Sequence, residues 1–198
     1  MSATARIKEA ALAAALLTAS ALPAYAHVEM GATSSFEAGF THPLLGLDHV
    51  TAMIAVGLWA ALKGGKAIWV WPATFVGVML AGGALGMLHV TVPLVEPGIL
   101  ASVVALGILV ALAVNLPVPA GVAVIGLFAL LHGHAHGREV PENAAGLEYM
   151  AGFALATLLL HGIGIAAGCG VGLKLRNVVQ AAGAACAAIG VGLAFGVI

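Results

Sequence analysis

Six long apolar stretches constrain this chain more than any other feature of its sequence. Each is long enough for an α-helix to cross the hydrocarbon core of a bilayer, which takes about 20 residues. Charged residues make up only 8% of the 198 residues, against about 25% in a typical soluble domain. So few charges cannot cover a water-facing surface, and we therefore expect an all-α membrane protein with its spans in one bundle. The predicted spans are residues 43–62, 67–91, 97–115, 118–137, 145–172 and 178–197.

The N-terminus has the pattern of a secretory signal peptide. Arg6 and Lys8 precede a short apolar run that ends in Ala-Tyr-Ala, a small-residue site typical of signal-peptide cleavage. We therefore expect residues 1–26 to be removed. The mature transmembrane domain, residues 27–198, would then begin with His27 outside the cytoplasm. The alternative is an uncleaved first transmembrane helix.

The basic residues predict how the spans are oriented. If the mature N-terminus is outside, the linkers at 63–66, 115–119 and 174–177 face the cytoplasm. Four of the five Lys and Arg residues of the mature chain then lie inside, in agreement with the positive-inside rule. This predicts a multi-pass protein of the bacterial inner membrane with a periplasmic N-terminus. The four inner residues are Lys63, Lys66, Lys174 and Arg176, and the outer one is Arg138.

The sequence THPLLGLDHV places polar side chains at the start of an apolar stretch. We expect one continuous helix here, capped by Thr41 and with Pro43 in its first turn. His42 and His49 are seven residues apart, which puts them on nearly the same side of that helix. Asp48 needs a functional explanation most, because a charge deep in a bilayer costs roughly 2.5–3.5 kcal/mol or more. The alternative is a neutral Asp48 that holds two helices together by hydrogen bonds.

A second group of polar residues, LLHGHAHGRE, closes the fourth apolar stretch. His132, His136 and Glu139 are spaced by four and three residues, so they share one helical face, while His134 points to the opposite side. Imidazole and carboxylate groups suit Ni, Co, Zn, Cu or Fe. The alternative is a His-rich outer loop that binds metal only adventitiously. The candidate metal ligands are His42, Asp48, His49, His132, His136 and Glu139.

Four other residues are secondary candidates as metal ligands. Each carries an imidazole or a carboxylate in the outer part of the molecule or inside a predicted span. Each also has a simpler interpretation, as a packed or interfacial side chain. The four are Glu96, His27, His161 and His89.

Two residue types predict how the helices pack. Glycines recur at a spacing of four, as in Gly82 and Gly86, and small residues let membrane helices approach closely. Trp59, Trp69 and Trp71 lie near the predicted inner ends of the first two spans. Tryptophan in such places is most often an anchor at the membrane interface.

The two histidine motifs make the chain resemble the HupE/UreJ family of membrane metal permeases. That family has a His-x5-Asp-His pattern, which HPLLGLDH matches, and a His-Gly-x-Ala-His-Gly-x-Glu pattern, which HGHAHGRE matches. Leu131 stands where many members have an aromatic residue, a change that we expect to affect packing more than ligation. A separate nickel/cobalt permease family has a spacing one residue shorter, His-x4-Asp-His.

The resemblance implies uptake of nickel, or of cobalt, from the periplasm into the cytoplasm. The metal would be cargo, with no permanently bound cofactor and no enzymatic reaction. Two alternatives stay open, an intramembrane His/Asp zinc hydrolase and a metal sensor or assembly partner of a metalloenzyme. The sequence contains neither H-E-x-x-H nor G-x-S-x-G. The expected partners are lipid and a divalent metal ion, with a homo-oligomer left open, and the net charge of −1 argues against nucleic acid.

Overall fold

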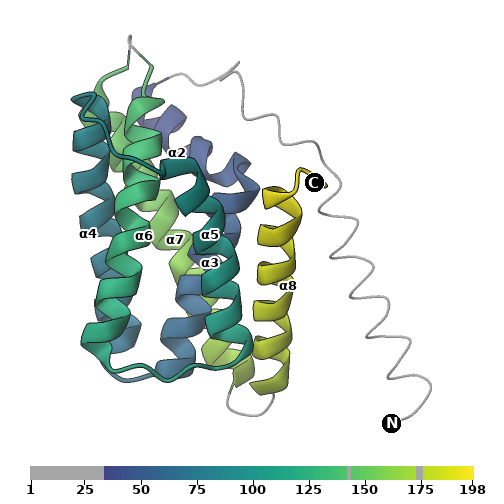
Figure 1. Ribbon diagram of the computed structural model, residues 1–198. Coiled ribbons are helices and arrows are strands. Elements are labelled where there is room, and N and C mark those ends of the chain that lie inside the picture. The colour runs from purple at the N-terminus through teal and green to yellow at the C-terminus, as the bar shows by residue number, and fades with distance from the viewer. Residues whose placement is uncertain (1–33, 142–143, 173–175) are drawn as a thin grey trace.

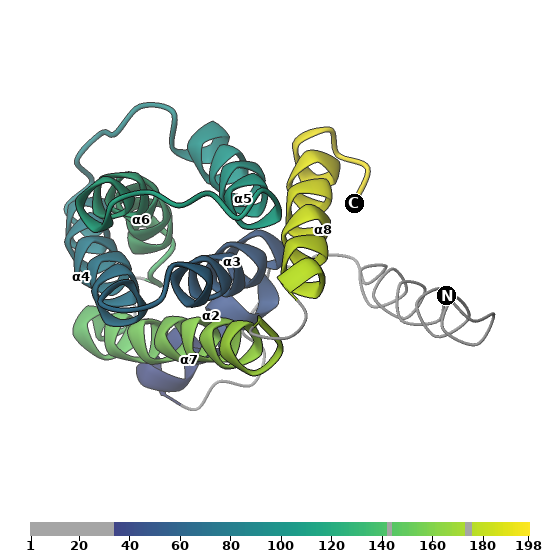
Figure 2. The same ribbon diagram turned by 90° about the horizontal axis from the view of Figure 1, so that it is seen from below.

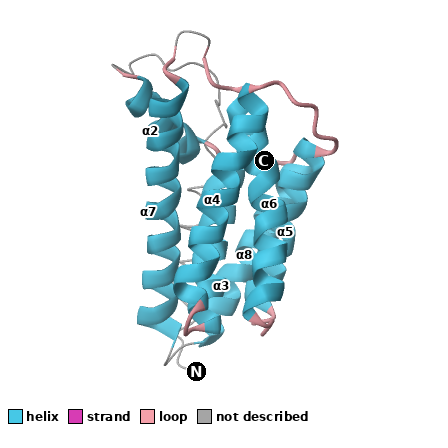
Figure 3. Cartoon of the chain, turned by 90° about the vertical axis from the view of Figure 1, so that its left-hand side faces the viewer, coloured by secondary structure: helices cyan, strands magenta, loops and turns pink. Residues whose placement is uncertain are grey.

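The computed structural model describes residues 34–141, 144–172 and 176–198, and every regular element within these ranges is an α-helix. The helices stand side by side in a bundle (Figure 1, Figure 3), as the sequence predicts. The proposed signal peptide and His27 lie outside the described residues. The helices are α2 (Ser35–Leu45), α3 (Leu47–Lys63), α4 (Ala67–Met87), α5 (Val95–Ala111), α6 (Val118–Arg138), α7 (Gly146–Gly172) and α8 (Arg176–Ala194).

The described helices differ in whether their length and apolar composition allow them to cross a membrane. Four of them, α4, α6, α7 and α8, are long and apolar enough by themselves. Helices α2 and α3 qualify only as a pair that is bent by 81°. Helix α5 has 17 residues, because the chain turns at Leu112 and Ala113, and Ala113 has a φ of 47°. Within the described ranges there are thus four spans, or five with the bent pair, where the sequence predicts six.

The bend between α2 and α3 breaks the first predicted span. Gly46, with φ −84° and ψ 113°, separates the two helices. Ser34 caps α2, and Pro43 lies inside it rather than in a first turn. The hydroxyl of Thr41 donates to carbonyls of α2, so Thr41 is not a cap. The prediction of one continuous helix here was wrong, because the 11 residues before Gly46 form a separate helix.

Helix α3 lies at the centre of the bundle, in contact with α4, α5, α7 and α8 (Figure 2). The α3–α4 and α5–α6 connections lie at one end, where Lys63 Nζ donates to Asn115 Oδ1 over 2.6 Å. This end also carries Lys66 and the start of α8 at Arg176, and is termed the basic end. Lys174 lies outside the described residues. The α4–α5 and α6–α7 connections lie at the opposite end, termed the histidine end (Figure 1).

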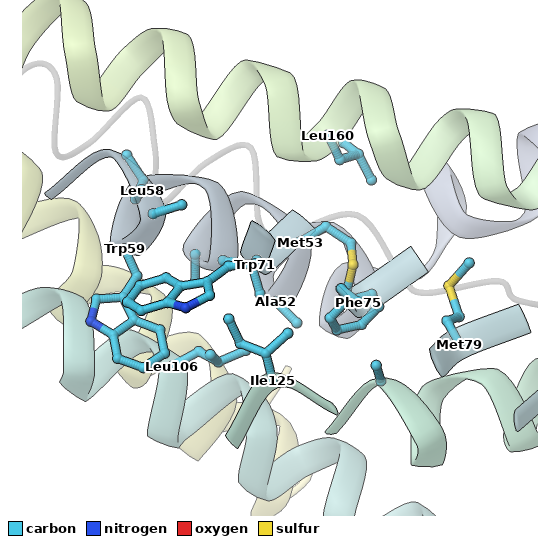
Figure 4. Packing of buried hydrophobic residues seen from close by; sticks show 14 of the residues in the cluster. Ala52, Met53, Leu58, Trp59, Trp71, Phe75, Met79, Leu106, Ile125 and Leu160 are labelled. Atoms are coloured by element: carbon cyan, nitrogen blue, oxygen red, sulfur yellow. The ribbon is translucent and has the colours of Figure 1, made fainter. Parts of the chain in front are cut away.

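Two tryptophans pack in the core near the basic end (Figure 4). The rings of Trp59 and Trp71 are 4.3 Å apart between centroids, and both side chains are fully buried. Their Nε1 atoms donate to the carbonyls of Val114 and Val118 over 2.8 and 3.1 Å. The prediction that these two anchor the protein in the membrane interface was therefore wrong. Trp69 is 77% exposed and faces outward.

Glycines bring α4 and α6 into backbone contact. A Cβ atom on Gly82 or Gly86 would collide with carbonyl oxygens of α6, and one on Gly133 or Gly137 would collide with carbonyl oxygens of α4. The predicted role of Gly82 and Gly86 in close packing is thereby confirmed. Because Gly133 and Gly137 alternate with the histidines of α6, this contact also fixes the part of α6 that carries the candidate ligands.

Candidate metal centre

Five of the six candidate ligands meet at the histidine end. His42 comes from the last turn of α2 and His49 from the first turns of α3. His132 and His136 come from the last two turns of α6, and Glu139 is the residue that ends that helix. The 81° bend between α2 and α3 turns His42 and His49 toward α6 from two different helices. They therefore converge on one place without sharing one helical face.

His42, His136 and Glu139 form one group, termed the outer triad. Nε2 of His42, Nδ1 of His136 and Oε2 of Glu139 form a triangle with sides of 3.2, 3.1 and 2.9 Å. Donor atoms about 2.1 Å from a metal and at right angles to each other would be about 3.0 Å apart. The triangle therefore has the size of one face of an octahedral coordination shell.

The Glu139 carboxylate supplies negative charge to the outer triad. Its side chain is 51% exposed, and it accepts from both imidazoles. Partial burial would raise the pKa of the Glu139 carboxyl, but the hydrogen bonds from His136 and His42 outweigh this and hold the pKa well below the usual range. The carboxylate therefore stays ionised at neutral pH and attracts cations to the histidine end.

His49, His132 and His136 form a second group, termed the inner triad. One ligand atom from each lies within 4.8 Å of the other two. The ring of His49 lies 5.4 Å from that of His132 and 5.1 Å from that of His136, between centroids. His49 and His132 are fully buried. Three imidazoles in an apolar interior are suited to a borderline metal ion such as Ni, Co or Zn.

His136 belongs to both triads. Its Nδ1 is 2.9 Å from Glu139, which leaves Nε2 as the nitrogen available to the inner triad. The rings of His42 and His49 both lie 5.1 Å from the His136 ring, and both stand nearly perpendicular to it. The two triads are thus adjacent and joined by one side chain.

Asp48 is the predicted ligand that the structure leaves outside both triads. It lies in the first turn of α3, and its Oδ1 accepts from the backbone N–H of His49 over 2.7 Å. A carboxylate at a helix N-terminus interacts favourably with the helix dipole. The bend at Gly46 makes this position the start of a helix, rather than a point six residues inside a span as the sequence suggests.

None of the three secondary candidates within the described residues belongs to either triad. Glu96, in the first turn of α5, and His89, just after α4, are both exposed. His161 is 1% exposed in α7, with its ring 5.2 Å from that of Phe75. Neither ring nitrogen of His161 has a hydrogen-bond partner among the described residues. His27 lies outside the described ranges.

His134 faces away from the triads, as the sequence predicts. Its Nε2 donates to the carbonyl of Val90 over 2.7 Å, in the connection between α4 and α5. The side chain is 1% exposed. His134 therefore ties the end of α6 to a neighbouring segment, while His132 and His136 face the ligand group.

Sequence reasoning missed three residues that line the triads. Phe153 of α7 lies 4.9 Å from the His49 ring and 4.7 Å from the His136 ring. Thr157 of α7 and Ser102 of α5 place their hydroxyls beside His49 and His132. Both hydroxyls are fully buried. A lone hydroxyl in an otherwise apolar helix was the available signal, because such a group needs a polar partner.

The fold and the two triads together define a multi-pass helical membrane protein that carries, at one end of its bundle, clustered side chains able to hold a metal ion. Comparison with known proteins identifies the family within this class. A model of the family described as HupE / UreJ protein matches residues 14–193. A relative, Protein HupE of Rhizobium leguminosarum bv. viciae, is 44% identical over 182 residues, which cover 91% of this chain and 95% of the relative.

The chain therefore belongs to the HupE/UreJ family. This is a transporter-type family related to nickel and cobalt transport, rather than a family of enzymes. No solved structure matches the chain. Leu131 packs against Gly98 of α5, and a Cβ atom on that glycine would collide with the Leu131 side chain.

Proposed function

We propose that this protein is a permease that carries nickel or cobalt as a divalent ion from the periplasm to the cytoplasm. The observation that supports this most is the pair of adjacent triads that share His136 at one end of an apolar bundle. Their nitrogen and oxygen donors are those that Ni2+ and Co2+ accept. A transported ion needs several binding steps of moderate strength, and two linked triads supply them.

Capture begins at the outer triad. The ionised Glu139 carboxylate attracts the hydrated cation, and His42 and His136 replace part of its water shell. Because Glu139 is 51% exposed and His42 is 21% exposed, an ion reaches these donors without a change in the fold. The acidic residue provides charge neutralisation that imidazoles alone lack.

Transfer to the inner triad uses His136 as the common ligand. The ion exchanges Glu139 and His42 for His49 and His132, and it passes from Nδ1 to Nε2 of His136. One ring cannot serve both triads fully at the same time, so we expect one ion to occupy the pair. The ion leaves the carboxylate behind, which weakens binding in the buried position and favours onward release.

The charge distribution supports entry from the periplasm. Lys63, Lys66 and Arg176 lie at the basic end, opposite the triads. Under the positive-inside rule the basic end faces the cytoplasm. The histidine end then faces the periplasm, as does the N-terminus left by removal of residues 1–26. N-terminal sequencing of the purified protein tests that cleavage.

Metal uptake by purified protein in proteoliposomes tests the proposed function. Radioactive Ni2+ and Co2+ are supplied in separate experiments, and accumulation is compared for the wild type and His136→Ala. We expect saturable uptake that His136→Ala abolishes. His89→Asn is the matched control, because His89 is exposed and outside both triads, and Asn tolerates its φ of 54°.

Other outcomes would point to the alternative functions. A protein that binds the ions without moving them across the vesicle would be a sensor or an assembly partner. Hydrolysis of lipid or peptide that depends on added zinc would indicate an intramembrane hydrolase. Equal uptake by the wild type and His136→Ala would rule out the two triads as the route of the ion.

A further inference from the structure

Two buried imidazoles of the inner triad are each paired with a buried hydroxyl from another helix. Nε2 of His132 lies 2.8 Å from Oγ of Ser102, which joins α6 to α5. Nε2 of His49 lies 3.3 Å from Oγ1 of Thr157, which joins α3 to α7. All four side chains are at most 1% exposed. The two pairs come from four different helices, so one local sequence pattern does not account for both.

The direction of the hydrogen bond between His132 and Ser102 follows from the second contact that the Ser102 hydroxyl makes. Oγ of Ser102 lies 2.6 Å from the carbonyl oxygen of Ile99, which can only accept. The single hydroxyl proton of Ser102 is therefore committed to Ile99. His132 must then be the donor, with its proton on Nε2. A neutral imidazole has only one N–H, so Nδ1 of His132 carries a free lone pair.

The second pair repeats this arrangement with a different acceptor. The hydroxyl of Thr157 donates to Sδ of Met79 over 3.7 Å. A thioether sulfur has no proton and can only accept. The lone pairs of Thr157 Oγ1 therefore face Nε2 of His49, which carries the proton. Nδ1 of His49 is left with its lone pair, as Nδ1 of His132 is.

The two free nitrogens have no other use within the described chain. Nδ1 of His49 and Nδ1 of His132 are both buried, and neither has a hydrogen-bond partner among the described residues. A buried polar atom without a partner costs about 1–3 kcal/mol. Both residues belong to the inner triad. One ligand atom of each imidazole of this triad lies within 4.8 Å of the others, and we take the unpartnered Nδ1 atoms of His49 and His132 as the ligand atoms.

We propose that Ser102 and Thr157 are positioning residues of the inner triad, which hold His132 and His49 as Nε2-protonated tautomers and so present both Nδ1 atoms to the metal ion. This deepens the proposed function and rests on it. The hydroxyls do not touch the metal. A metal-bound imidazole generally donates its other N–H to an acceptor, which fixes the ring and raises the basicity of the ligating nitrogen. Here each acceptor is a hydroxyl held in turn by a carbonyl or a thioether.

Matched substitutions separate this role from simple packing. Thr157→Val keeps the shape of the side chain and removes the hydroxyl, whereas Thr157→Ser keeps the hydroxyl. Ser102→Ala removes only Oγ. Thr74→Val is the control, because the hydroxyl of Thr74 bonds only the carbonyl of Val70 in its own helix. Thermal unfolding in detergent identifies any variant that fails to fold.

Co2+ binding to the purified full-length protein is the first measurement, by calorimetry and by the visible absorption of bound Co2+. Loss of the group that accepts the N–H of a metal-bound imidazole weakens metal binding by about 10–100-fold. We expect this increase in Kd for Thr157→Val and for Ser102→Ala, with Thr157→Ser and Thr74→Val close to the wild type. A Kd within twofold of the wild type in both Thr157→Val and Ser102→Ala, with folding intact, would overturn the proposal.

Nitrogen-15 NMR of the metal-free, histidine-labelled protein is the second measurement, because it reads the tautomers directly. We expect protonated Nε2 on His49 and His132 in the wild type, and a mixture of tautomers for His49 in Thr157→Val. Protonated Nδ1 on both rings of the wild type would overturn the proposal.

Uptake into proteoliposomes distinguishes this proposal from the proposed permease function. A protein that binds Co2+ through these rings but does not transport it ends the permease proposal and leaves this one intact.

Discussion

Nε2 of His42 lies 3.2 Å from Nδ1 of His136, although 94 residues separate them in the sequence. Both atoms also lie within 3.1 Å of the same oxygen of Glu139. This contact depends on the bend at Gly46, which points the last turn of α2 toward the end of α6. The ring of His49 also lies 5.1 Å from the same His136 ring, between centroids. His136 is therefore the residue on which both triads depend.

The shared position of His136 predicts unequal effects of ligand substitutions. His136→Ala removes a donor from both triads, whereas His42→Ala and Glu139→Gln each alter only the outer one. We expect His136→Ala to abolish saturable Ni2+ or Co2+ binding, and the other two to raise Kd while saturable binding remains. Isothermal calorimetry on purified variants measures this, with His89→Asn as the control.

An equal loss in all three variants would contradict the sharing of His136. It would indicate one site that needs every donor at once. A His136→Ala protein that still bound one ion with unchanged affinity would show that His136 is not a ligand at all. Either result would remove the basis for a stepwise transfer between the triads.

Substitutions of Asp48 test whether its negative charge or its hydrogen bond is what the protein needs. Its Oδ1 accepts from the backbone N–H of His49, and the amide oxygen of an asparagine can accept the same bond. If Asp48 acts at the start of α3 chiefly through this bond, Asp48→Asn keeps the stability and much of the uptake, while Asp48→Ala lowers both. Loss of one hydrogen bond of this kind costs about 0.5–1.5 kcal/mol.

The hydrogen bond to the His49 N–H favours a structural role for Asp48 in the first turn of α3, so we expect Asp48→Asn to retain the thermal unfolding midpoint of the wild type and most of its uptake. The measurements are thermal unfolding in detergent and metal uptake in proteoliposomes. Asp48→Asn that folds like the wild type but takes up no metal would instead assign the charge itself to the ion path. That outcome would restore Asp48 as the sixth ligand suggested by the sequence.

The glycines of α6 predict a position-dependent effect on stability. A Cβ on Gly133 would collide with the α4 backbone, whereas one on Gly126 would meet only side-chain methyls of Thr74 and Val78, at 3.9 Å. We expect Gly133→Ala to lower the unfolding temperature clearly and to reduce metal binding, because α6 must move away from α4. Gly126→Ala, on the same helix, should unfold at the wild-type temperature or slightly above it, since alanine favours a helix by about 1 kcal/mol. Similar midpoints for both variants would contradict the backbone contact.

Local patterns predicted the α6 half of the site, and long-range contacts supplied the rest. The spacing of His132, His136 and Glu139 follows from helical periodicity alone, and the structure keeps the last two in hydrogen-bond contact. The bend at Gly46 was missed because a single glycine among leucines does not distinguish a helix break from a tolerated interior residue. Convergence of His42 and His49 on α6 could not be predicted without it.

The supporting hydroxyls were missed for a different reason. Ser102 and Thr157 lie 30 and 108 residues from the imidazoles that they contact. A buried hydroxyl in an apolar helix signals a polar partner, but it does not name that partner, because serine and threonine can also bond a carbonyl of their own helix. Thr74 does this, with Val70. Only the packing of α5 and α7 against the centre of the bundle distinguishes the two cases.

His161 is a buried histidine on the path that an ion would follow beyond the inner triad. It is 1% exposed in α7, one turn beyond Thr157 toward the basic end, and neither of its ring nitrogens has a partner among the described residues. Such a residue lowers stability, because an apolar side chain of similar size would avoid the cost of an unpaired polar group, and its presence therefore points to a function. His161→Leu should therefore unfold at the wild-type temperature or above it.

We expect His161→Leu to slow uptake by proteoliposomes while leaving the Kd for Co2+ at the triads unchanged, because the residue would act only after the ion leaves the inner triad. The matched control is Leu160→Met, which changes a neighbouring buried side chain and adds no nitrogen ligand. Uptake by His161→Leu equal to that of the wild type, together with increased stability, would show that His161 is a packing residue. A raised Kd would instead place it within the inner triad itself.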